Sequence, residues 1–558
     1  SIQITDLLRN GLGDDTLSEF MSPHGPRLQA RGKFALDENG LRLNSLGSLS
    51  CQHFRFLGIP FEKIDTEFSW KDGDIYLRNL SVRHEAGQLT GEVKFQDDLV
   101  QYRARTSLPL SAYRPFIKEG SGLERVLEDS RFTSESRILA DTRGSIQRSN
   151  LRDWDATGTF RVENFLYNEV PVVLAAADFY MSPLDYIFDN VEAVFDYRQN
   201  RPDREFTGPA SGTARVRQIH FDAETRLTSL INLEGDIWPA PVLQLFIPHS
   251  ARHIADTYRF RKPPHLVANG IIDHRKPGDR TDVLTTFKAD GLADITFLGE
   301  PLAVDALAGT VRSRYRENEI SELTMKTLGG AITGDIMHRS HPNRVSVRLR
   351  CEDLDVSQIG RTYRFSRNVP GLLTASVAAE MKQEQSGEAA PGWDVQGTCT
   401  LGRCIYNGVP LAGGSTRFSI NDQGSTLTNG KLVFDYSDYP VKKLHDGPES
   451  AVVEVERIHH HGKSRSTEIV NLRGTAWPGP LLGLVDTSTA GLIDEMFRFR
   501  EPPTFTTSGR IDHNKTGAGI LLDSSISCGG IVDYDFLGKT LQLTKVSANI
   551  KSGLEIIP

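Results

Sequence analysis

The chain has 558 residues, 38% hydrophobic and 24% charged, which supplies enough apolar material for a folded core and excludes compositional disorder. Its 64 basic and 72 acidic residues give a net charge of −8, which argues against nucleic acid as the main partner. The five cysteines, an odd count in so long a chain, do not predict a disulfide framework. No run approaches the 18 apolar residues of a membrane-spanning helix.

In chain order, the pattern predicts an N-terminal helical stretch at residues 6–20 and then short strands. Residues 74–83 alternate apolar and polar side chains, as do residues 322–326, and glycine-containing turns follow both. Such segments predict antiparallel meanders with one apolar face. Two stretches, residues 119–150 and 382–392, are predicted linkers.

Short amphipathic helices are predicted to close the modules. One begins after Trp238-Pro239, with an apolar stripe that includes Leu243 and Ile254. Its counterpart covers residues 481–497 after Trp477-Pro478, with Leu482 and Ile493 in the equivalent stripe, and a third is predicted over residues 356–365. Pro-Pro pairs after Phe260 and Phe499 stop the first two helices.

The sequence repeats itself at an interval of 239 residues. Residues 232–239 return at 471–478, residues 258–264 at 497–503, and Gly270-Ile-Ile-Asp-His274 returns as Gly509-Arg-Ile-Asp-His513. A finer repeat of an aromatic, a turn and a Pro-apolar step divides the chain into five modules. They cover residues 1–145, 146–265, 266–385 and 386–504, followed by a partial fifth module at 505–558.

Catalytic patterns are weak throughout. Gly462-Lys463-Ser464 lacks the earlier glycine of a phosphate-binding loop, and the run from His459 to His461 reads as a solvated histidine patch. Asp273-His274 and Asp512-His513 are expected to make turn or strand-end hydrogen bonds. We therefore expect no enzyme, no catalytic residues, no cofactor and no metal.

The alternation predicts an apolar lining on one face of the sheet. A sheet with one apolar face and few helices must either curl into a packed core or hold an apolar ligand, and the sequence leaves both open. The residues expected to line an apolar groove are Leu80, Val82, Phe195, Leu323, Met325, Leu432 and Phe434.

The repeat pattern appears in residues 56–61 and 297–302 and in the strands that begin with glycine. It resembles the repeat pattern of the AsmA-like family (AsmA/YhdP/TamB-type) of diderm bacteria. The resemblance covers nearly the whole chain. It implies an elongated, repetitive antiparallel β-groove in the periplasm, anchored in the inner membrane by a helix outside this fragment. It also implies a non-enzymatic role in carrying phospholipid for outer-membrane and envelope biogenesis, with inner- and outer-membrane proteins as partners.

Two other functions remain open at this point. The first is a repetitive structural or adhesin-like β scaffold whose core is filled and binds nothing. The second is a carbohydrate-active β-helix enzyme, which is disfavoured because no paired carboxylates recur at equivalent positions.

Overall fold

The computed structural model describes most of the chain. The described residues are 20–23, 25–37, 40–56, 58–71, 73–109, 112, 127–150, 153–196, 211–239, 258–260, 262–275, 278–297, 300–341, 343–364, 369–382, 392–437, 448–484, 487–514 and 519–552. They form two compact units, unit 1 (Ser1–Ala289) and unit 2 (Asp290–Pro558), which divide within one strand. The boundaries between the five predicted modules remain a prediction.

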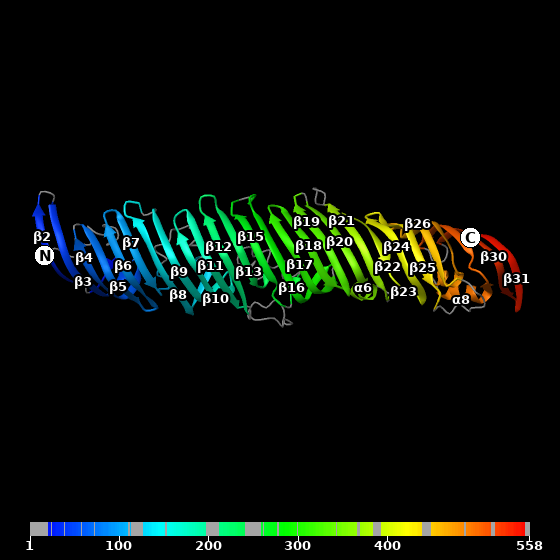
Figure 1. Ribbon diagram of the computed structural model, residues 1–558, viewed down its shortest axis with the longest axis horizontal. Helices are drawn as coiled ribbons and strands as arrows, with labels where there is room; N and C mark the ends of the chain where they lie inside the picture. Colours follow the sequence, from blue (N-terminus) through cyan, green and yellow to red (C-terminus); the bar gives the residue numbers. More distant parts are fainter. Residues whose placement is uncertain are drawn as a thin grey trace. The chain divides into compact units, whose positions relative to one another are not determined.

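The prediction of a mainly β, repetitive antiparallel sheet with short helices is confirmed. Strands make up 77% of the described structure. Within each unit the strands follow one another side by side in chain order (Figure 1), and nearly every strand pairs with the strands just before and after it. At about 4.8 Å per strand, this stacking makes the sheet of each unit long across its strands.

The strands of unit 1 are β1 to β15 and the first half of β16. Their bounds are β1 Phe20–Met21, β2 Arg27–Asp37, β3 Gly40–Phe56, β4 Ile59–Lys71, β5 Asp74–His84, β6 Gly87–Gln96, β7 Leu99–Thr106, β8 Ser130–Gln147, β9 Trp154–Tyr167, β10 Val170–Met181, β11 Asp185–Asp196, β12 Ser211–Asp222, β13 Leu227–Asp236, β14 Tyr258–Phe260, β15 His265–Asp273 and β16 Asp282–Phe297.

The described part of unit 2 holds the second half of β16, the strands β17 to β31 and three short helices. The strands are β17 Glu300–Arg314, β18 Glu317–Thr327, β19 Gly330–Ser340, β20 Asn343–Asp355, β21 Leu372–Lys382, β22 Gly392–Leu401, β23 Cys404–Tyr406, β24 Val409–Asn421, β25 Gly424–Asp435, β26 Ser450–His461, β27 Ser466–Thr475, β28 Phe497–Phe499, β29 Thr504–Asp512, β30 Ile520–Phe536 and β31 Lys539–Ser552. The helices are α6 Val356–Thr362, α7 Pro478–Gly483 and α8 Thr487–Met496.

Two element predictions need correction. Residues 119–150 are not a linker throughout, because β8 occupies Ser130–Gln147 and pairs with β7 and β9. The single helix predicted over residues 481–497 consists of α7 and α8, and Phe497 already begins β28. Phe20, the last residue of the helical stretch predicted at residues 6–20, begins β1 instead. The rest of that stretch, the helix with Leu243 and Ile254, and most of the linker at 382–392 lie outside the described residues.

The 239-residue repeat has structural counterparts in the two units. Ile237 donates its backbone N–H to the Pro264 carbonyl, and Ala476 donates to the Pro503 carbonyl over the same N···O distance of 3.2 Å. The next residue in each case is a buried tryptophan, Trp238 or Trp477. Trp477 immediately precedes α7, where Pro478 occupies the first helical turn and needs no N–H partner.

Asparagine-centred irregularities recur inside the strands of both units. Residues with positive φ lie within β3, β5, β9, β11, β13, β18, β20, β25, β27 and β31, and six of these ten residues are asparagine. The pairing register shifts at such points, as between Leu230 and Leu233 in β13 and between Ile469 and Leu472 in β27. A β-bulge bends its strand and increases the local twist, so these positions curve the sheet of each unit.

Candidate ligand-binding face

One face of the unit 2 sheet carries a closed apolar cluster, and we call this side the inner face. Its centre is Phe434, whose side chain is 0% exposed, and Trp477 packs in the same cluster. Leu481 in α7 and the adjacent Leu484 pack against the cluster. The helix thus covers part of the inner face, as predicted for the helix that follows Trp477-Pro478.

A second, smaller cluster lies on the inner face of β18 to β22. Ile332 and Cys351 are buried at its centre, and Ile359 from α6 packs against it. Asp355 caps α6 by accepting the N–H of Ser357 over 2.8 Å, which fixes the helix to the end of β20. Short helices therefore cover the inner face at both clusters.

The bulge at Asn429 divides β25 into two segments. The closed segment, Leu432 to Phe434, belongs to or packs on the covered cluster. The open segment precedes the bulge and includes Leu427, which is 37% exposed. The same order holds in β27, where Leu472 packs on the cluster and Ile469 lies beyond the bulge at Asn471.

Leu427 faces the same side as the cluster despite the register shift. Leu427 pairs with Phe418, which pairs with Gly397, and directly paired residues share a face of the sheet. Gly397 lies two residues before Cys399 and four residues before Leu401, so all three residues share one face of β22. Cys399 and Leu401 pack against the inner-face clusters, so Gly397 also lies on the inner face. A Cβ at Gly397 would lie 2.8 Å from the Phe418 ring, so glycine makes room for that ring on the inner face.

A continuous set of directly paired residues crosses the inner face of unit 2, and we call it the central row. All its members are apolar or glycine. They are Leu323, Gly334, Leu349, Val377, Gly397, Phe418, Leu427, Ile458, Ile469, Gly509 and Leu522.

Unit 1 has its own central row with the same construction. It runs through Leu80, Gly91, Ala104, Thr142, Gly158, Phe179, Phe188, Ile219, Leu230, Gly270 and Val283. From Gly158 onward, each member precedes its unit 2 counterpart by 239 residues. Phe160 adds a third aromatic ring beside Phe179 and Phe188, with centroid distances of 6.3 and 6.0 Å.

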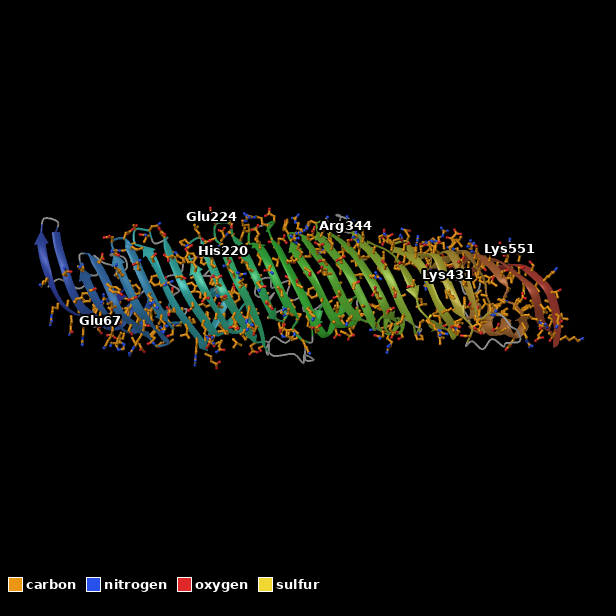
Figure 2. The ribbon with its side chains drawn as sticks, viewed as in Figure 1. Glu67, His220, Glu224, Arg344, Lys431 and Lys551 are labelled. Atoms are coloured by element: carbon orange, nitrogen blue, oxygen red, sulfur yellow. The ribbon has the colours of Figure 1, made fainter. Side chains whose placement is uncertain are left out.

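The opposite side of the unit 2 sheet, the outer face, is polar. Lys431 lies on it between two inner-face positions, Gly430 and Leu432 (Figure 2). Three exposed ion pairs cross neighbouring strands there: Arg344–Glu380, Arg473–Glu454 and Arg457–Glu468. Such pairs stabilise little, but they make this face the more polar side of these described strands.

The residues predicted to line a groove occupy two environments. Leu80 and Leu323 begin the central rows, while Val82 and Met325 lie two residues further along the same strands and are partly buried. Phe434 is sealed in the closed cluster, Leu432 packs against it, and Phe195, the unit 1 counterpart of Phe434, is 4% exposed. Their contact with a ligand remains a prediction.

Most residues of the central rows were missed by sequence reasoning. Phe179 and Phe418 are aromatics separated by the 239-residue repeat interval, and so are the glycines Gly158 and Gly397, but neither pair was predicted to line the groove. The register that places Phe418 over Gly397 depends on long-range pairing between β22 and β24, which residue spacing alone does not reveal.

The expected hydrogen bonds of the Asp-His pairs are present. His274 Nε2 lies 2.7 Å from the Thr228 hydroxyl, and His513 Nε2 lies 2.8 Å from the Thr467 hydroxyl. Asp273 accepts two hydrogen bonds of 2.9 Å from the Arg275 guanidinium, which holds the pKa of this carboxyl well below its usual range. These groups fix strand ends through turns and ion pairing.

Three of the described cysteines are in surroundings that disfavour the reactive thiolate. Burial raises the pKa of the Cys351, Cys399 and Cys404 thiols, which keeps them protonated and unreactive. In the described ranges, no group of three or more His, Cys, Asp or Glu side chains is placed to hold a metal ion.

A search of the described helices for membrane spans finds none with the necessary length and apolarity. Comparisons of the chain with protein-family models, with curated proteins and with solved structures give no match. The resemblance to AsmA-like proteins therefore remains a prediction based on the repeat pattern, and the central rows are what the structure itself contributes to a functional hypothesis.

Proposed function

We propose that this protein is a non-enzymatic carrier that binds, or conducts, phospholipid or another apolar ligand along the inner faces of its sheets. The observation that carries the proposal is the central row. In each unit, directly paired residues present an almost unbroken apolar strip across consecutive strands, while the outer face of unit 2 bears charges and ion pairs.

Part of the apolar inner face remains exposed to solvent. Phe434 and its neighbours are covered by α7, whereas Leu427 and Ile420 on the same face remain 37% and 47% exposed. Burying one methylene of an acyl chain against such a surface contributes about 0.8 kcal/mol. A strip that continues from strand to strand can therefore hold an acyl chain by apolar burial alone, without bond-making chemistry.

The resemblance to AsmA-like proteins supports a cellular setting for this activity. On that basis we place the protein in the periplasm of a diderm bacterium, anchored in the inner membrane in its full-length form and acting in outer-membrane and envelope biogenesis. Its protein partners would then be components of the inner and outer membranes. The predominance of antiparallel strands with a single apolar face agrees with this setting.

A repetitive structural scaffold is the second candidate, and the closed cluster favours it. Phe434 is fully buried and Val409 and Ala476 are 1% exposed, so this part of the inner face is filled by the protein itself. A scaffold would need the rest of the inner face to be filled in the same way.

Organic extraction of the purified protein, followed by mass spectrometry of the extract, tests the proposal. A carrier purified from bacterial cells should release phospholipid in a reproducible molar ratio to protein. The control is the same protein with Leu427 and Ile420 both changed to Asn, which places polar groups on the open segment. Equal lipid content in the two proteins, or none in the wild type, would favour the scaffold.

A further inference from the structure

Two histidines of β26 contact each other on the outer face of unit 2. His459 Nε2 lies 3.0 Å from His461 Nδ1, and the two ring centroids are 4.0 Å apart. Residues two apart on a strand point to the same face, which explains the contact. His460 between them points to the other face, where its Nδ1 lies 3.1 Å from the Thr467 hydroxyl.

The surroundings hold this pair in place. The Thr426 hydroxyl lies 2.7 Å from His459 Nδ1, so the second ring nitrogen, Nε2, is the one directed at His461. A hydrogen bond to one ring nitrogen that orients the other is a common feature of metal-binding histidines. Glu468 pairs with His459 across the strands, but its carboxylate forms an ion pair with Arg457 at 3.4 Å.

The nitrogen separation suits a divalent metal ion. With metal–nitrogen bonds of about 2.05 Å, two nitrogens 3.0 Å apart subtend an angle of about 94° at the metal. That angle is close to the 90° of neighbouring ligands in tetragonal coordination, which Cu²⁺ and Ni²⁺ adopt with imidazole ligands. For the ion to bind, the rings would turn so that both nitrogen lone pairs point at it rather than at each other, and water would complete the coordination.

The equivalent place in unit 1 is built differently. There the counterpart of His459 is His220 (Figure 2), whose Nε2 is paired with Asp185 Oδ1 at 2.7 Å. The counterpart of Asp185 in unit 2 is Gly424, which has no side chain to offer. The counterpart of His461 is Asp222, which accepts hydrogen bonds from Thr225 in its own turn. Unit 2 thus has two facing imidazoles where unit 1 has a carboxylate–histidine pair.

We propose that His459 and His461 form a two-imidazole chelating site for a late first-row divalent metal ion, with Cu²⁺ as the best-fitting ion. The site lies on the outer face, so the proposal is independent of what the inner face binds. Its role would be to bind or sense metal at the surface of unit 2.

Titration of the full chain with CuSO4 at pH 7.5, followed by calorimetry and by electron paramagnetic resonance, tests this site. We expect one class of bound Cu²⁺ whose spectrum shows two nitrogen ligands. His459→Gln and His461→Gln should each remove that class. Thr426→Val should weaken it about tenfold, because the orienting hydrogen bond is lost.

The matched controls are His460→Gln, the neighbour on the opposite face, and His220→Gln, the unit 1 counterpart. Both should keep the two-nitrogen class, which separates this site from background binding by the chain's 15 histidines. Circular dichroism of each variant shows whether the fold is kept. If a folded His459→Gln protein retains the two-nitrogen class, or if the wild type lacks it, the pair is only a hydrogen bond and the proposal is wrong.

Discussion

The two segments of β25 differ in what covers them. After the bulge at Asn429, Phe434 lies under α7 and is 0% exposed, whereas Leu427 before the bulge is 37% exposed on the same face. One strand therefore contributes both to a packed core and to an apolar surface without a covering helix. The apolar face of this chain therefore includes two environments: a covered one that stabilises the fold and an exposed one that we propose binds ligand.

Changing Phe434 to Asp should give the largest effect on stability. The carboxylate would be buried without a partner in the closed cluster, at a cost of about 4 kcal/mol or more. Thermal unfolding of the purified variant checks this, and Tyr406→Asp at the partly buried border of the cluster provides a milder comparison. If the Phe434→Asp protein has the melting temperature of the wild type, the closed segment is not a packed core, and the contrast with the open segment is wrong.

Substitutions at the bulge should have an intermediate effect. Asn471 has a φ of 52°, and its side-chain amide donates to Glu456 over 3.3 Å. Asn471→Ala should cost about 1–2 kcal/mol because alanine, unlike asparagine, has no short polar side chain whose local hydrogen bonds offset the strain of a positive φ. Asn471→Gly should lie closer to the wild type, since glycine adopts positive φ freely. Chemical denaturation of the two variants measures the difference, and equal losses would exclude backbone strain as the cause.

The ion pair at the end of β15 predicts a pH dependence. The pKa of Asp273 is lowered by Arg275, so its contribution to stability is complete above the ordinary carboxyl pKa of about 4 and is lost as the pH falls below that value. Asp512, its repeat counterpart, is followed at the equivalent position by Asn514 in place of Arg275.

Melting temperatures between pH 7 and pH 2 test this difference. Asp273→Asn should destabilise the protein at pH 7 more than Asp512→Asn does, and the gap between the two variants should close as the pH falls below 4. A gap that stays constant over this range would mean that charge pairing at Asp273 is not responsible.

The smallest expected effect on stability is that of Leu427→Asp. Its side chain is already 37% exposed, so the carboxylate stays hydrated and the free energy of unfolding should change by less than about 1 kcal/mol. The same change should reduce the phospholipid recovered with the protein. Normal stability with undiminished phospholipid would argue against the open segment as the binding surface.

Sequence reasoning captured the parts of this fold that depend on local pattern. Two-residue alternation predicted strands, and Trp477-Pro478 predicted the start of α7, because both signals are local. The bulges were not predicted. A positive φ at Asn429 or Asn471 changes which side chains share a face, but nothing in the sequence distinguishes such an asparagine from an ordinary surface residue of a strand.

The sequence predicted the candidate binding face only in part, because contacts between residues far apart in the chain decide the rest. Leu80, Val82, Leu323 and Met325 were placed on a common face by alternation within one strand. The burial of Phe434 depends on Trp477 and Leu481, which pack on it from more than forty residues away in the chain. The contact between His459 and His461 follows from strand geometry, but its significance depends on the loss of the Asp185 counterpart at Gly424.

The most direct test of the account compares two positions of similar exposure on opposite faces. Leu427 on the inner face is 37% exposed, and Val452, whose neighbours Ala451 and Val453 belong to the inner cluster, is 40% exposed on the outer face. A photo-crosslinking amino acid at each position, activated in bacterial cells, reports which face meets lipid. The account predicts phospholipid adducts at position 427 and few at position 452. Equal crosslinking at both positions, or none at 427, would contradict it.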